Sequence, residues 1–100
     1  MELRDLKTFG VVAGTLSFSR AAQVLNTSQS TISARIATLE EELGVRLFDR
    51  MSRKVVLTDA GARLSGFARK ILDLEAEARD WVAGSADHGG SLQFGRFSPS

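Results

Sequence analysis

The sequence predicts a mainly α-helical domain with a short two-stranded hairpin, followed by one long helix. Residues 3–13 and 32–43 repeat apolar side chains at intervals of three and four, the spacing of a helix with one buried face. Residues 54–57 have the composition of a β-strand and follow a polar turn. Residues 59–82 then repeat apolar side chains over nearly three heptads. With 100 residues, the chain can build one small apolar core.

The first two expected helices are short. The stripe of the first consists of Leu3, Leu6, Phe9, Val12 and Ala13. We expect Gly14 to end or weaken this helix, because glycine is a poor helix former. In the second, Ser17 or Ser19 can cap the N-terminus, and Asn26 suits a left-handed stop. Its apolar contacts are expected from Ala21, Ala22, Val24 and Leu25.

A third helix is expected almost immediately afterwards, with Ser28 as its cap and Gly44 as its C-terminal breaker. Its apolar stripe consists of Ile32, Ile36, Leu39 and Leu43. Two helices joined by so tight a turn indicate a helix-turn-helix.

The opposite face of the third helix carries unusually small and uncharged side chains, namely Ser30, Thr31, Ala34, Ala37 and Thr38, flanked by Gln29, Ser33 and Arg35. An ordinary exposed face would favour Lys, Glu and Gln. Small side chains let a helix approach the DNA major groove closely, where Gln can pair with adenine and Ser or Thr with base edges or phosphates. Helix capping alone explains one or two hydroxyls at the start of the helix, but it does not explain Ser33, Ala34, Ala37 and Thr38 further along.

The segment that follows is basic. Two short strands around a turn at residues 51–53 would form a wing, with Arg50, Arg53 and Lys54 at its rim. There they could contact phosphates or enter a narrow minor groove. Taken alone, such a cluster more often indicates a solvated surface than a binding site.

Together these features predict a winged helix-turn-helix, formed by three helices and a short two-stranded wing. The pattern from Leu6 to Gly61, including SFS, SQ, LEEELGVRLFDR and LTDAG, resembles the DNA-binding domain of LysR-type transcriptional regulators. The resemblance implies sequence-specific binding to an inverted-repeat operator in double-stranded DNA. It assigns base and phosphate contacts to Gln29, Ser30, Thr31 and Ser33, and a minor-groove contact to Arg53. We also expect Ser28, the cap of the third helix, at the DNA-binding surface.

The chain departs from the family pattern at three positions. The family usually has Pro or a similar residue where Ser30 stands, and Arg where Ala34 stands. Arg35 therefore either compensates for the lost Arg or points elsewhere. The family also has Gly where Leu16 stands, so we do not expect a left-handed turn at Leu16 and assign that role to Gly14.

A long helix is expected next, with Thr58 or Asp59 as its cap. Its a and d positions are Leu64, Phe67, Ile71, Leu74, Ala78 and Trp81. The first turn is expected to pack on the domain and the remainder to form a subunit interface. In the family, the corresponding linker helix pairs with its twin, which implies a homodimer here and allows a dimer of dimers in the full-length parent. The register already accounts for Trp81, which disfavours a stacking role for it.

We therefore divide the chain into a DNA-binding domain at residues 1–58, a linker helix at 59–84, and a hinge with the truncated start of an effector domain at 85–100. The stretch LQFG resembles the first strand of the family's ligand-sensing domain. We expect the sensor domain itself to be absent from this chain. An alternative is a dimerisation-only truncation that antagonises full-length regulators without reading DNA.

Composition argues against catalysis. The chain has no cysteine or tyrosine, one histidine in a Gly-rich stretch, and no phosphate-binding loop or metal-ligand spacing. We therefore expect no cofactor and no metal. The N-terminus is charged and no apolar run approaches a membrane span, so we expect a cytoplasmic protein. Because the net charge is only +1, the distribution of charge along the chain indicates more about a binding partner than the net charge does.

Overall fold

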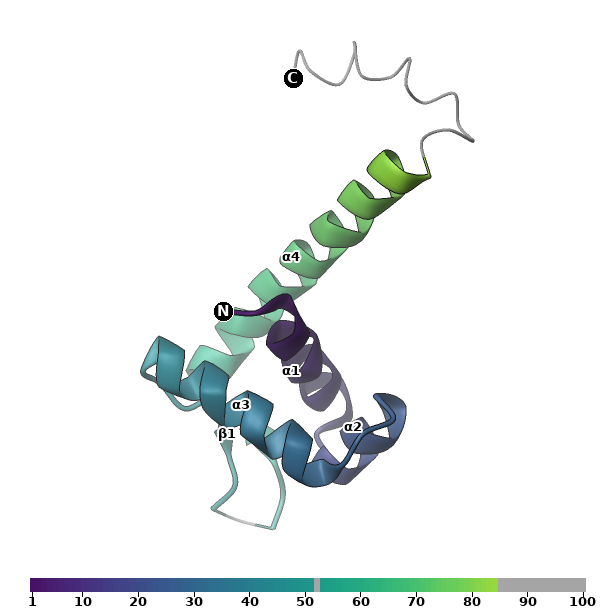
Figure 1. Cartoon of the computed structure of the whole chain (residues 1–100). Coiled ribbons are helices and arrows are strands. Elements are labelled where there is room, and N and C mark those ends of the chain that lie inside the picture. Colours follow the sequence, from purple (N-terminus) through teal and green to yellow (C-terminus); the bar gives the residue numbers. More distant parts are fainter. Residues whose placement is uncertain (52, 85–100) are drawn as a thin grey trace.

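The computed structural model describes residues 1–51 and 53–84 and builds them into helices and one antiparallel hairpin (Figure 1). The elements are α1 (Leu3–Thr15), α2 (Phe18–Val24), α3 (Gln29–Leu43), β1 (Phe48–Asp49), β2 (Val56–Leu57) and α4 (Asp59–Ala83). The predicted winged helix-turn-helix and the long helix after it are therefore confirmed. The predicted hinge and truncated effector domain at 85–100 lie outside the described residues. None of the described helices is both long enough and apolar enough to cross a membrane.

The C-terminus of α1 differs from the prediction. The helix runs through Gly14 to Thr15, and Leu16 takes the left-handed conformation with φ 52°. Local hydrogen bonds hold it there: the Leu16 N–H donates to the Val12 carbonyl at 2.6 Å, and the Ser17 N–H donates to the Thr15 hydroxyl at 3.3 Å. The assignment of this turn to Gly14 was wrong because these bonds offset the strain of a left-handed leucine.

The other predicted helix ends are confirmed. The Ser17 hydroxyl caps α2 by accepting the Arg20 N–H, and the Ser28 hydroxyl caps α3 by accepting the Thr31 N–H. Asn26 lies between these helices at φ 56°, and Gly44 ends α3 at φ 71°. Short polar caps and one left-handed residue therefore produce the tight turn between α2 and α3.

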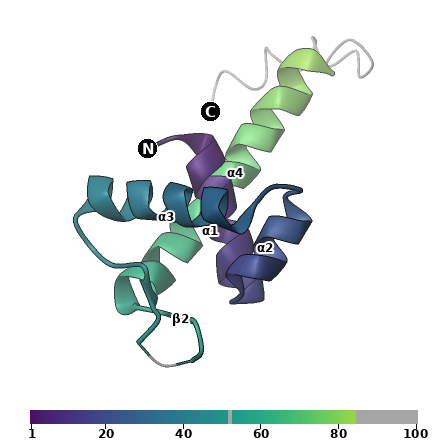
Figure 2. The same ribbon diagram turned by 60° about the horizontal axis from the view of Figure 1, so that its bottom comes forward.

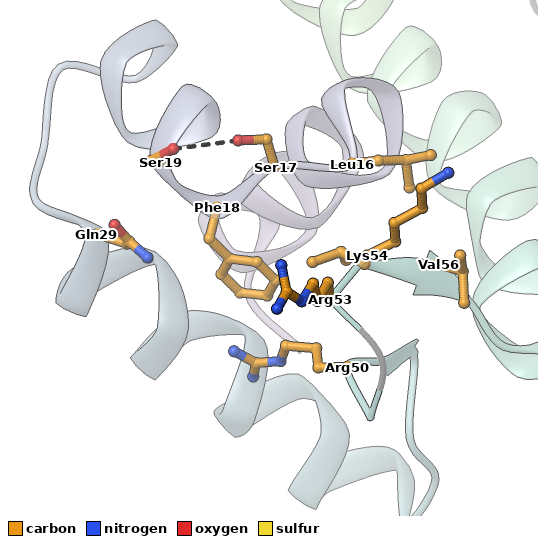
Figure 3. Close-up of a pocket in the computed structure, with 10 residues that line it drawn as sticks. Leu16, Ser17, Phe18, Ser19, Gln29, Arg50, Arg53, Lys54 and Val56 are labelled. Carbon is orange, nitrogen blue, oxygen red and sulfur yellow. Dashed lines mark hydrogen bonds between the residues drawn. The ribbon is translucent and has the colours of Figure 1, made fainter.

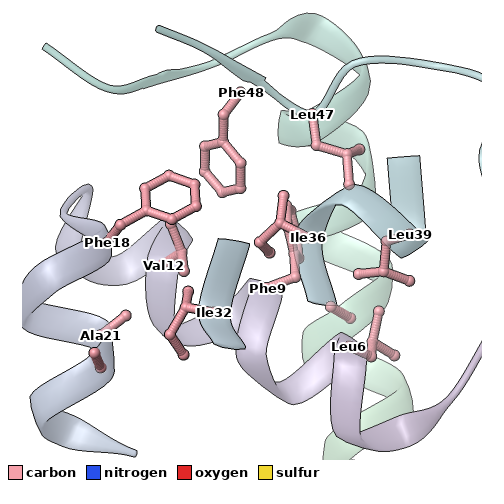
Figure 4. Close-up of a cluster of buried hydrophobic side chains, with 12 residues drawn as sticks. Leu6, Phe9, Val12, Phe18, Ala21, Ile32, Ile36, Leu39, Leu47 and Phe48 are labelled. Atoms are coloured by element: carbon pink, nitrogen blue, oxygen red, sulfur yellow. The ribbon is translucent and has the colours of Figure 1, made fainter. Parts of the chain in front are cut away.

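The core lies where α1, α2 and α3 meet the base of the wing (Figure 4). Its largest fully buried side chains include Leu6, Phe9, Ile32, Ile36, Leu39, Leu47 and Phe48. Three predicted core residues are exposed instead: Leu3 by 44%, Val24 by 60% and Leu43 by 42%. Each is the first or last residue of its helix, where the neighbouring helices no longer cover the apolar stripe.

The wing is a minimal hairpin in which Phe48 pairs with Leu57 and Asp49 pairs with Val56. Its second strand begins at Val56, two residues later than the predicted start at Lys54. Glu40 joins the base of the wing to α3, since its carboxylate accepts the Leu47 N–H at 2.8 Å. The inward face of the hairpin therefore extends the helical core.

The helix α4 begins at the Thr58 cap and packs its first half against α1. Its buried side is formed by Gly61, Leu64, Ala68, Ile71 and Leu72. The second half projects from the domain in the direction opposite to the wing (Figures 1 and 2). This arrangement leaves α3 and the wing at one end of an elongated molecule of 53 × 27 × 19 Å.

Candidate nucleic-acid interface

The first turn of α3 presents a compact set of hydroxyl and amide groups. The Ser28 hydroxyl lies 3.1 Å from the Ser30 hydroxyl and 2.9 Å from that of Thr31. Ser28, Gln29 and Ser30 are exposed, and Thr31 is partly buried. Among the described residues, no side-chain hydrogen-bond partner is found for Gln29. Its amide therefore keeps both its donors and its acceptor for a ligand.

The wing and the start of α2 enclose a groove with this end of α3 (Figure 3). The residues lining it are Leu16, Ser17, Phe18, Ser19, Gln29, Arg50, Arg53, Lys54, Val55 and Val56. The structure thus brings together the predicted residues Gln29, Arg50, Arg53 and Lys54, which come from two separate parts of the chain.

The electrostatics of this groove favour an anion. Three cationic side chains line it, and none of its lining residues carries a carboxylate. The N-terminus of α3 opens beside it, and the free N–H groups of a helix N-terminus add positive potential there. The groove is therefore a locally cationic surface on a chain whose net charge is only +1.

Phe18 is a groove residue that sequence reasoning did not identify. The guanidinium carbon of Arg50 lies 4.2 Å from the centre of the Phe18 ring. Phe18 itself is 5% exposed and meets Phe48 edge to face, with 5.8 Å between ring centres. The sequence signal is an aromatic residue between two serines at a helix start, a pattern that supports capping and the family resemblance but does not indicate a neighbour in the wing.

Arg35 does not join the groove. Its guanidinium donates to the Thr8 hydroxyl of α1 at 3.2 Å, and it lines a separate depression with Asp5, Ala34 and Thr38. Arg35 therefore connects α3 to α1 and is not among the residues that line the groove. Ala34 is exposed beside it, with no cation in the place where the family usually has one.

The predicted stripe of α4 divides into two parts. Leu64 and Ile71 are partly buried and pack against the domain's own core. Four stripe residues are instead exposed, with exposed fractions of 60% for Phe67, 65% for Leu74 and 40% for Trp81, and with Ala78 also exposed. An exposed apolar stripe on a projecting helix is a typical protein contact surface.

Three helices, a tight turn and a cationic wing beside the second helix of the motif define a winged helix-turn-helix protein. Residues 3–62 match the family described as "Bacterial regulatory helix-turn-helix protein, lysR family". The chain belongs to this family.

Known relatives agree with the match. The HTH-type transcriptional regulator YofA of Bacillus subtilis (strain 168) is 42% identical over 95 residues, which cover 95% of this chain and 33% of YofA. The crystal structure of a BenM_DBD/catB site 1 DNA complex is 37% identical with a TM-score of 0.82, covering 86% of this chain and 96% of that one. That of a CbnR_DBD-DNA complex is 38% identical with a TM-score of 0.80, covering 86% and 99%. The chain spans about a third of the length of the first curated relatives it matches, 32% and 33%.

Proposed function

We propose that this chain binds double-stranded DNA in a sequence-specific manner, with α3 in the major groove and the wing in the minor groove. The observation that carries the proposal is the groove itself, which combines three cations, no carboxylate and Gln29 from the first turn of α3. Phosphates would be held by the cations and base edges would be read by short side chains. The similarity to BenM_DBD and CbnR_DBD, both crystallised in complexes with DNA, supports the same mode.

The DNA contacts in this proposal come from the groove and from the small-residue face of α3. Gln29 supplies the base-reading amide, while Ser28, Ser30, Thr31 and Ser33 contact phosphates or base edges. Arg50, Arg53 and Lys54 contact the backbone, and Arg53 enters the minor groove. Ala34 contributes shape and apolar contact instead of charge. Arg35 remains a predicted contact, because its bond to the Thr8 hydroxyl of α1 uses only one of its five N–H donors.

We also propose that the chain acts as a homodimer on an inverted-repeat operator. The support is the exposed apolar part of the α4 stripe, together with the projection of the second half of α4 away from the wing. Pairing through α4 would leave both α3 helices accessible to two half-sites. Two half-sites double the number of phosphate contacts made by a module of modest charge.

The decisive test is the salt dependence of binding in an Arg53→Ala variant. We expect weaker binding to both selected and random duplex, and a slope of log K against log salt that is shallower by about 1 per subunit. Fluorescence anisotropy titrations between about 50 and 200 mM salt would measure this slope. The matched control is Arg69→Ala, an exposed arginine on α4 outside the groove, which should bind like the parent chain.

The same experiment separates DNA reading from the dimerisation-only alternative. A chain that only blocks full-length regulators through α4 has no need of the cationic groove. Unchanged affinity for promoter duplex in both Arg53→Ala and Gln29→Ala would therefore contradict the DNA-binding proposal and favour that alternative.

A further inference from the structure

The contact between Phe18 and Arg50 joins two elements that are far apart in the sequence. Phe18 opens α2, whereas Arg50 follows directly after β1 in the wing. The guanidinium carbon lies over the ring at 4.2 Å, within the range of a cation–π contact. The ring cannot easily move, because it is 5% exposed and packs edge to face on Phe48.

Arg50 has no competing anionic partner within the part of the chain that the structure describes. The neighbouring carboxylate of Asp49 instead accepts the Met51 N–H at 2.9 Å. The ring of Phe18 is therefore what holds the Arg50 guanidinium at the rim of the groove.

A cation–π contact and a salt bridge differ in whether the N–H donors of the arginine stay available to a ligand. A carboxylate partner would occupy the N–H donors of a guanidinium, whereas an aromatic ring contacts only its face. The donors lie in the plane of the group and remain able to form a bidentate bond to a phosphate. A stacked arginine also loses less side-chain freedom on binding than a free one, because its orientation is already restricted.

We propose that Phe18 is a positioning residue that holds Arg50 in the orientation needed to bind a backbone phosphate of DNA. This inference rests on the proposed DNA-binding function and assigns a role that neither the caps nor the core packing require. It also links the two parts of the fold mechanically, since a residue of α2 would determine where a residue of the wing meets the DNA.

The test is a double-mutant cycle in the full chain, using Phe18→Leu, Arg50→Ala and the pair. With Arg50 present, Phe18→Leu should weaken binding to a selected duplex by about threefold to tenfold, the size of a partly desolvated cation–π contact. In the Arg50→Ala background, the same change should have little further effect. Equal losses in both backgrounds would overturn the proposal, because a purely structural role for Phe18 does not depend on Arg50.

Phe18→Tyr is the matched variant, since it keeps the aromatic face. We expect its affinity to stay within about twofold of that of the parent chain. A loss as large as that of Phe18→Leu would count against the ring as the relevant group.

If circular dichroism shows that Phe18→Leu does not fold, the Arg50→Lys variant tests the proposal instead. Lysine keeps the charge but lacks the planar group that stacks and binds phosphate bidentately. We expect Arg50→Lys to lose most of the DNA affinity that Arg50→Ala loses. Affinity equal to that of the parent chain would overturn it.

A measurement on the DNA-free chain separates this inference from the function on which it rests. The ring current of Phe18 should shift the side-chain proton resonances of Arg50 upfield, and Phe18→Leu should abolish that shift. Absence of the shift overturns the stacking. A clear shift in a chain that binds no duplex would instead overturn the proposed function, and with it the role of Arg50 toward phosphate.

Discussion

Single side chains near the wing take roles that depend on where their neighbours lie. Glu40 belongs to a run of three glutamates that, by sequence, fan around α3. In the structure it accepts N–H bonds from Leu47 at 2.8 Å and Phe48 at 3.5 Å, and lies 3.6 Å from the Arg46 guanidinium. Glu41, the next residue, is exposed. Adjacent residues of one type therefore differ sharply in their contribution to the fold.

We expect Glu40→Ala to lower the free energy of unfolding by about 1–3 kcal/mol, because it leaves a partly buried N–H without an acceptor. Glu41→Ala should change it by no more than about 0.5 kcal/mol. Urea denaturation followed by circular dichroism would measure both. Equal effects would mean that the Glu40 bond does not support the base of the wing.

Gln29 is the residue to which we assign base reading. Its exposed amide, with no partner among the described side chains, can pair with a base edge in the major groove. We expect Gln29→Ala to relax preference at one base pair per half-site, with a cost of about 1–3 kcal/mol on the preferred base only. Binding titrations against single-base operator variants would measure this. Equal losses on selected and random duplex would assign Gln29 to backbone contact instead.

At the scale of the elements, α4 is joined to the wing by a close approach at Gly61. A Cβ placed there would lie 2.2 Å from the Leu47 carbonyl oxygen and 2.8 Å from the Leu57 side chain. Gly66, one and a half turns further along the same helix, has no neighbour within 4 Å of such a Cβ. The first glycine is therefore required by packing, and the second is not.

These two glycines should respond to alanine in opposite directions. Gly61→Ala should destabilise the fold by about 1–3 kcal/mol, because a backbone oxygen must move. Gly66→Ala should stabilise it by about 0.5–1 kcal/mol, since alanine is the better helix former at an open position. Thermal and urea melts would show the sign of each change. A neutral Gly61→Ala would imply that the wing can shift on α4 at little cost.

At the scale of the whole molecule, the division of the α4 stripe decides which residues remain for a partner. Ile71 packs on the domain's own core, so a polar substitution there would disturb folding as well as assembly. Leu74 is 65% exposed and is not among the residues that pack against the core. It is therefore the sharper probe of a dimer interface.

We expect Leu74→Asp to raise the dissociation constant of the proposed dimer by about a hundredfold or more, because two leucines that the dimer would bury are replaced by charges. The control is Ala62→Asp, an apolar-to-acid change at an exposed position off the stripe, which should leave the dimer intact. Sedimentation over a range of concentrations would measure both. A Leu74→Asp dimer as tight as the parent would locate the interface elsewhere.

The sequence by itself determined the helices, their caps and the family. Apolar spacing, Ser17, Ser28 and Gly44 act within a few residues of themselves, so their consequences are local and readable. Leu16 was the local exception, because hydrogen bonds to residues on either side outweighed the general preference for glycine.

Only the tertiary structure decided which distant groups meet. Gln29 and the wing cations share a groove because the hairpin folds back beside the start of α3, and Arg35 leaves that surface because Thr8 of α1 lies within bonding distance. The folding back of the hairpin also places Arg50 against the ring of Phe18. Such contacts depend on the packing angle between elements, a quantity that periodicity and capping do not encode.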